Sequence, residues 1–105
     1  MELILAILAA LDLIEEYSLK YTVATGIDLE AYVDTWAPFH KAMNRLKKLD
    51  RDGTMVQRIT KAMLNVASLG RALGNNPFDV DAQIAYREAD ASLRAYLKAL
   101  GDILE

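Results

Sequence analysis

Apolar residues recur at intervals of three and four along most of the chain, and this spacing predicts α-helices rather than strands. The segment from Leu3 to Ile14 is the most apolar, because eleven of its twelve residues are apolar and only Asp12 is not. A helix that is apolar on every side has to be covered on every side. We therefore expect the other helices to pack around this segment.

Four segments carry the helical pattern, and turn-forming residues separate them. They run from about Glu2 to Ala24, from Asp28 to the turn at Asp50–Gly53, from Thr54 to Gly74, and from Pro77–Asp79 almost to the end of the chain. Because the whole pattern is helical, the sequence predicts an all-α fold. The connections are short, so neighbouring helices are expected to run antiparallel. The expected architecture is an antiparallel up-down-up-down four-helix bundle, formed as a single domain by residues 1–105.

Two local features refine this prediction. Pro38 lies inside the second helical pattern, where a proline removes a backbone hydrogen bond and clashes with the preceding turn. The apolar spacing continues past it, so we expect one helix that is kinked near Pro38. At the start of the third helix, Thr54 and Gln57 have the spacing of a capping box, with Thr54 as the N-cap.

The first helix carries more apolar surface than a simple bundle buries. One face, with Ile4, Ile7 and Leu11, fits the bundle seam, whereas other leucines fall on the side that would be left in water. An exposed apolar patch marks an interface, so the sequence predicts a homodimer through the first helix. Asp12 is expected either at an edge or paired with a base, including a base across the subunit interface. The predicted interface residues are Leu5, Asp12, Leu13, Leu19 and Ile84.

Aromatic residues gather at one end of the predicted bundle. In the up-down arrangement this end would hold Tyr17, Tyr21, Tyr32, Trp36 and Tyr86. One interpretation is an aromatic cap whose hydroxyl groups bond to water, since a buried tyrosine needs a partner for its hydroxyl. The other is a small pocket for a hydrophobic or aromatic ligand, because helix bundles place ligand sites between facing helices.

Charge is unevenly distributed along a chain whose formal net charge is only −3. The seven acids and one base of residues 1–34 give −6, the eight bases and two acids of residues 35–74 give +6, and the remaining six acids and three bases give −3. The middle segment holds a basic patch of Lys41, Arg45, Lys48, Arg51, Arg58 and Lys61. Such a patch either binds phosphate groups or complements acidic helices of the same fold. The isoelectric point of about 5.1 argues against a nucleic-acid partner.

Candidate chemistry is sparse. The chain has no cysteine, and its one histidine, His40, lies beside the apolar seam of the second helix. A lone histidine in a helix bundle can ligate haem or carry a phosphoryl group, but most often it is a boundary residue with a hydrogen-bonded ring. The pattern contains no Glu-x-x-His metal motif and no phosphate-binding glycine loop. We therefore expect no enzyme activity, cofactor or metal.

The apolar segment Leu3–Ile14 is shorter than the roughly 20 residues that span a bilayer. Together with the lack of cysteine, this favours a soluble, cytoplasmic protein with no membrane partner. The sequence thus predicts a small non-catalytic interaction or regulatory protein that self-associates through its first helix and is open to a protein partner. The alternative is a bundle that binds a small hydrophobic or aromatic ligand at its tyrosine-rich end.

Overall fold

The fold is all-α and consists of four helices. A computed structural model describes residues 2–20 and 29–104, apart from the side chains of residues 2, 16–20 and 29–35. The helices are α1 (Glu2–Lys20), α2 (Leu29–Leu49), α3 (Thr54–Asn75) and α4 (Val80–Leu104). The four predicted helices are confirmed, and the described residues contain no strand. The predicted end of the first helix at Ala24 and the predicted start of the second at Asp28 lie outside the described residues.

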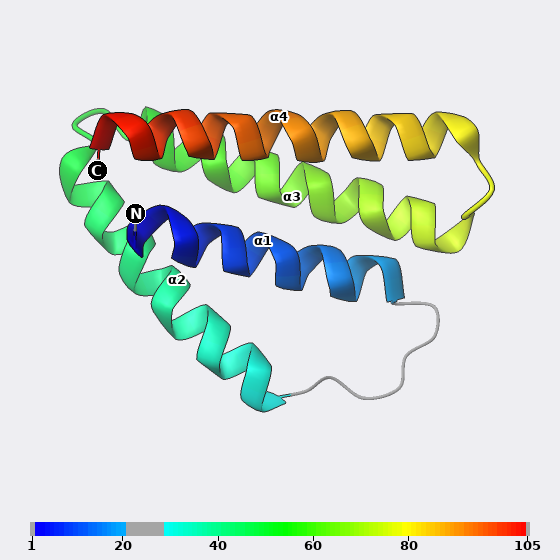
Figure 1. Ribbon diagram of the computed structural model, residues 1–105, viewed down its shortest axis with the longest axis horizontal. Helices are drawn as coiled ribbons and strands as arrows, with labels where there is room; N and C mark the ends of the chain where they lie inside the picture. Colours follow the sequence, from blue (N-terminus) through cyan, green and yellow to red (C-terminus); the bar gives the residue numbers. More distant parts are fainter. Residues whose placement is uncertain (1, 21–28, 105) are drawn as a thin grey trace.

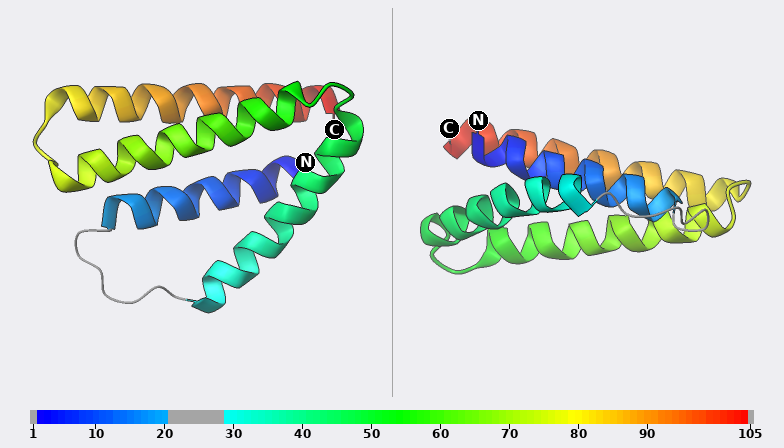
Figure 2. Two further views of the ribbon diagram at one scale, coloured as in Figure 1. Left: turned by 180° about the vertical axis from the view of Figure 1, so that it is seen from behind. Right: turned by 90° about the horizontal axis from the view of Figure 1, so that it is seen from below.

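Helix α1 lies at the centre of the arrangement, because it packs against each of the other three helices. Helices α3 and α4 pack along each other, whereas α2 packs mainly on α1, touches α3 only slightly and makes no contact with α4 among the described residues. Figure 1 shows successive helices running in alternating directions, with α2 leaning away from the α3–α4 pair. Viewed from below, α1 and α4 form one layer and α2 and α3 the other (Figure 2). The four helices and their alternating directions agree with the predicted bundle. The packing differs from a regular bundle, because α2 contacts α1 far more than α3.

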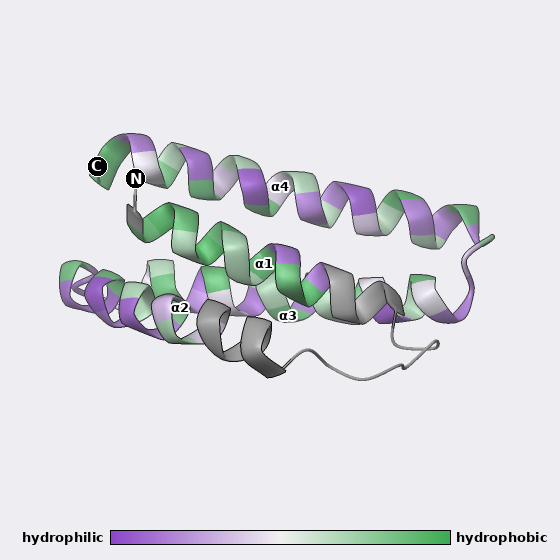
Figure 3. Cartoon of the chain, turned by 60° about the horizontal axis from the view of Figure 1, so that its bottom comes forward, coloured by the Kyte–Doolittle hydropathy of each residue, from purple (hydrophilic) through white to green (hydrophobic). Residues whose placement is uncertain are grey.

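The core is built from the predicted seam of α1. Ile4, Ile7 and Leu11 are completely buried, and they pack with buried side chains of the other three helices. Those partners include Leu46, Ile59, Met63, Val66, Leu93, Leu97 and Leu100. Figure 3 shows the N-terminal half of α1 as the most continuously hydrophobic stretch of the ribbon. Burial of this apolar surface is the main force that holds the four helices together.

The predicted exposure of Leu13 is wrong. Its side chain is only 9% exposed, which places it in the buried set. The reason is the central position of α1. A helix at the corner of a square bundle is covered on two sides, whereas α1 is covered by α2, α3 and α4 together. Leu5, on the remaining open side of α1, is 58% exposed.

Helix α2 is continuous from Leu29 to Leu49 and carries Pro38 within it. The unbroken helix agrees with the prediction that a single helix continues past the proline. The predicted kink near Pro38 stays a prediction. The C-terminal turn of α2 ends with Lys47 and Lys48, which interact favourably with the negative end of the helix dipole.

The start of α3 differs from the predicted capping box. Gly53 is the N-cap, with a φ of 74° in the left-handed region that glycine adopts without strain. Two aspartates of the preceding turn accept the free N–H groups: Asp52 accepts from Thr54 at 3.1 Å, and the buried Asp50 accepts from Val56 at 3.0 Å. Carboxylates complement the positive end of a helix better than a threonine hydroxyl does. The hydrogen bonds from Thr54 also lower the pKa of Asp52.

Candidate functional sites on the two faces of α4

A cluster of ionised side chains joins α1 to α4. The guanidinium of Arg94 donates from Nη2 to Asp12 at 2.6 Å and to Glu15 at 2.7 Å, and from Nε to Asp90 at 2.9 Å. Asp90 and Arg94 are four residues apart on α4, and Asp12 and Glu15 are three apart on α1, so each pair shares one face of its helix. We call these four residues the Arg94 cluster.

The Arg94 cluster holds three carboxyl groups and one positive charge. Burial, helped by the neighbouring carboxyl group of Asp90 and opposed by Arg94, raises the pKa of Glu15 to about 7. Two carboxyl groups can share a hydrogen bond only when one of them carries a proton. Oε1 of Glu15 is buried and has no hydrogen-bond partner, which adds to the cost of ionising this carboxyl group. The cluster therefore binds a proton near neutral pH.

Two further groups respond to the same charges. Burial, together with the negative charges of Glu15 and Asp90, raises the pKa of Tyr86 to about 12. Burial alone would lower the pKa of Arg94, but its hydrogen bonds to the three carboxylates raise it above the ordinary value. Arg94 thus stays charged, and the tyrosine hydroxyl stays neutral, well above neutral pH.

For Asp12, the structure shows both predicted features, an exposed position at the edge and a basic partner. Its carboxylate pairs with a base of the same chain, Arg94, and its side chain remains 65% exposed. The sequence pattern alone does not identify Arg94 as that base. One signal was present, because Asp90 and Arg94 have the i, i+4 spacing of a helical ion pair.

The predicted tyrosine pocket is only partly covered by the described residues. Tyr21 lies outside them, as do the side chains of Tyr17, Leu19 and Tyr32. Of the remaining two, Trp36 packs edge-on against Phe39 with ring centroids 5.0 Å apart, and Tyr86 lies at the margin of the core. They belong to α2 and α4, which make no contact in the described part of the chain. A pocket shared by all five aromatic residues stays a prediction.

The basic patch is exposed in all six of its residues. Five of them, namely Lys41, Arg45, Lys48, Arg51 and Lys61, form no ion pair with any acid among the described residues. Pairing with acidic helices of the same fold therefore does not account for these five charges within the described part of the chain. The sixth, Arg58, stacks on an aromatic ring instead, with its guanidinium carbon 4.4 Å from the ring centroid of Tyr96.

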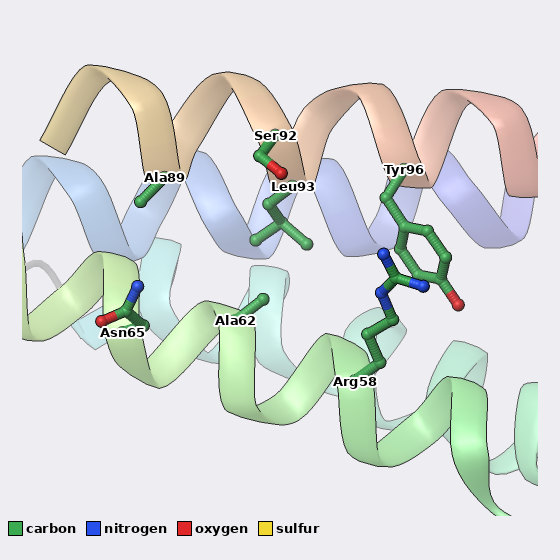
Figure 4. Close-up of a pocket in the computed structure, with 7 residues that line it drawn as sticks. All are labelled: Arg58, Ala62, Asn65, Ala89, Ser92, Leu93 and Tyr96. Carbon is green, nitrogen blue, oxygen red and sulfur yellow. The ribbon is translucent and has the colours of Figure 1, made fainter. Parts of the chain in front are cut away.

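Arg58 and Tyr96 stand at one end of a groove between α3 and α4, on the side of α4 that faces α3. The groove has a volume of about 140 Å³. Its lining residues are Arg58, Ala62 and Asn65 from α3 and Ala89, Ser92, Leu93 and Tyr96 from α4. Figure 4 shows Arg58 and Tyr96 at one end, Asn65 and Ala89 at the other, and Ala62, Ser92 and Leu93 between them. We call this feature the α3–α4 groove.

His40 is exposed on α2, and its ring lies 5.5 Å from Phe39 and 5.9 Å from Trp36 between centroids. These ring contacts fit the expected boundary residue. In the described part of the chain, no group of three or more histidine, cysteine or acidic side chains is arranged to hold a metal ion. Within the same residues, no helix has the length and apolar character needed to cross a membrane.

The fold and these sites define an all-α chain of four helices with a charged cluster on one side of α4 and a small groove on the other. Comparison with protein-family models, with curated proteins and with solved structures finds no match to this chain.

Proposed function

We propose that the chain is a small non-catalytic helical interaction protein that forms a two-fold homodimer through the outer side of α1 and α4. The observation that carries the proposal is the exposure of two large aliphatic side chains on these helices. Leu5 on α1 is 58% exposed and Ile84 on α4 is 50% exposed, although α1 is packed against three other helices. Burial of both side chains against a second copy of the chain would remove this apolar surface from water.

The Arg94 cluster fixes where these two residues lie relative to each other. Asp12 and Arg94 are in contact, so they mark the same level along the antiparallel helices α1 and α4. Leu5 lies seven residues from Asp12 in one direction, and Ile84 lies ten residues from Arg94 in the other. At 1.5 Å per residue, Leu5 and Ile84 are separated by about 25 Å along the helix axes.

This separation suits an isologous dimer. A two-fold axis that crosses α1 and α4 near Asp12 and Arg94 reverses the helix direction, so Leu5 of each copy meets Ile84 of the other. Each contact then occurs twice, as two-fold symmetry requires.

The Leu5→Glu variant tests this proposal. A glutamate at this position would have to be desolvated in the interface, so we expect the dimer dissociation constant to rise at least about tenfold. The measurement is sedimentation equilibrium, with circular dichroism to show that the helices are retained. Leu5 is largely exposed, so the substitution leaves the core intact.

Leu64→Glu is the matched control. Leu64 is 66% exposed on α3, so the substitution has the same chemistry and a similar exposure but lies off the α1–α4 surface. We expect its dissociation constant to equal that of the wild type. Equal weakening by both variants, or by neither, would show that α1 does not provide the interface.

A further inference from the structure

The α3–α4 groove combines one charged end with an apolar floor. Residues 58, 62 and 65 of α3 follow the i, i+4, i+7 spacing, and residues 89, 92, 93 and 96 of α4 follow a matching pattern. Each helix therefore directs one face into the groove. Ala62, Ala89 and Leu93 form the apolar part, and the small alanines leave the space that larger residues would fill.

Arg58 is held in place without losing its hydrogen-bonding capacity. Its guanidinium stacks on the Tyr96 ring at 4.4 Å, and it forms no ion pair or hydrogen bond with any described residue. Stacking occupies the face of the guanidinium and leaves its N–H edges available. An edge with two parallel N–H groups matches the two oxygens of a carboxylate.

The opposite end of the groove offers a weaker polar group. Asn65 lies seven residues after Arg58 on α3, which places it about 10 Å further along the helix axis. Its amide and the Ser92 hydroxyl form no hydrogen bond within the described part of the chain. Both can bond to a polar substituent at the far end of a ligand.

From this geometry we propose that the α3–α4 groove binds a small organic monocarboxylate with an aromatic or compact apolar body. The carboxylate pairs with Arg58, the body covers Ala62, Ala89 and Leu93, and a polar substituent reaches Asn65. The volume of about 140 Å³ is close to that of a protein cavity of about 150 Å³ that holds benzene. The apolar floor favours a monocarboxylate with an apolar body over inorganic phosphate, which has no apolar part to cover it.

The test is a titration of the isotope-labelled full chain with sodium benzoate at constant ionic strength, followed by amide chemical shifts. We expect saturable shifts confined to residues of the groove, with a dissociation constant of about 5 mM for a ligand of this size. 4-Hydroxybenzoate is expected to bind more tightly, and benzyl alcohol, which lacks the charge, about tenfold more weakly. Inorganic phosphate in place of benzoate is expected to give no saturable shift.

Three variants locate the binding. Arg58→Gln removes the charge and is expected to weaken benzoate binding about tenfold, whereas Lys61→Gln removes an exposed cation outside the groove and is expected to have no effect. Ser92→Leu fills the groove from an exposed position of α4, so binding is expected to be lost while the helical circular dichroism is retained.

Three outcomes would overturn the proposal. They are the absence of saturable shifts with benzoate, equal weakening by Arg58→Gln and Lys61→Gln, and shifts spread over the whole basic patch. The last would mean that the anion binds by general electrostatic attraction, and phosphate would then compete as well as benzoate does. These outcomes are independent of the dimer, because the groove faces α3 and the proposed interface lies on α1 and the outer side of α4.

Discussion

Replacement of Arg94 by methionine is expected to lower the free energy of unfolding by about 2 kcal/mol at pH 8. Arg94 donates hydrogen bonds to Asp12, Glu15 and Asp90, and without it three carboxylates face one another with no positive charge between them. Removal of one partner of a buried ion pair costs about 3–5 kcal/mol, but Asp12 is largely exposed, and solvent screens part of the repulsion. Urea denaturation measures the change.

Arg87→Met is the control for this prediction. Arg87 is exposed on the same helix and forms no ion pair with any residue that the structure describes. The same substitution there removes a solvated charge only, and the change in stability is expected to stay within about 0.5 kcal/mol. If the two variants are equally stable, the Arg94 cluster does not hold α1 against α4.

The second large effect is a dependence of stability on pH. Glu15 has an ordinary pKa of 4.5, and burial raises its pKa to about 7 in the folded chain. Between these two values the folded state binds more protons than the unfolded state, so the free energy of unfolding falls as pH rises. The contribution of Glu15 is complete below pH 4.5 and is lost as pH rises through 7. With allowance for solvent screening, the loss is about 1.5 kcal/mol.

The Glu15→Gln variant isolates this contribution. A glutamine amide resembles the protonated carboxyl, because it can donate to Asp90 and accept from Arg94. We therefore expect its stability to stay nearly constant from pH 5 to pH 8 and to exceed that of the wild type at pH 8. Glu88→Gln, at an exposed position of α4, is expected to retain the wild-type slope. A wild-type slope in Glu15→Gln would contradict the assignment.

The sequence was sufficient to predict the helices and the core. The spacing of Ile4, Ile7 and Leu11 identified the buried face of α1, because a helix of 3.6 residues per turn has only one way to bring these side chains together. The turn formers at Asp50–Gly53 likewise located the end of α2 and the start of α3. Both features depend on local geometry, which the sequence records directly.

The arrangement of the helices could not be obtained in the same way. Leu13 was assigned to the surface because the sequence does not show how far the neighbouring helices cover α1, and its burial follows from the contact of α1 with three partners. At the start of α3, Thr54 matched a known capping pattern, but the nearby carboxylates of Asp50 and Asp52 reached the N–H groups instead. Which side chain accepts from the free N–H groups of the helix depends on the path of the backbone through the preceding turn.

The two candidate sites show the same limit. Asp12 was recognised as a residue in need of a base, but its partner is 82 residues away and depends on the register of α1 against α4. Arg58 was grouped with other basic residues by charge alone. Its stacking on Tyr96 and the groove beside it exist only because α3 and α4 bring small residues face to face. Contacts between distant elements require the three-dimensional structure.

The central claim is that the chain self-associates through the surface of α1 and α4 that carries Leu5 and Ile84. Multi-angle light scattering on the wild-type chain at pH 7 tests it most directly, with protein concentrations raised to about 1 mM. The chain has a mass of 11.7 kDa, and we predict a molar mass that approaches twice this value as the concentration rises. A molar mass of 11.7 kDa at every concentration would contradict the claim.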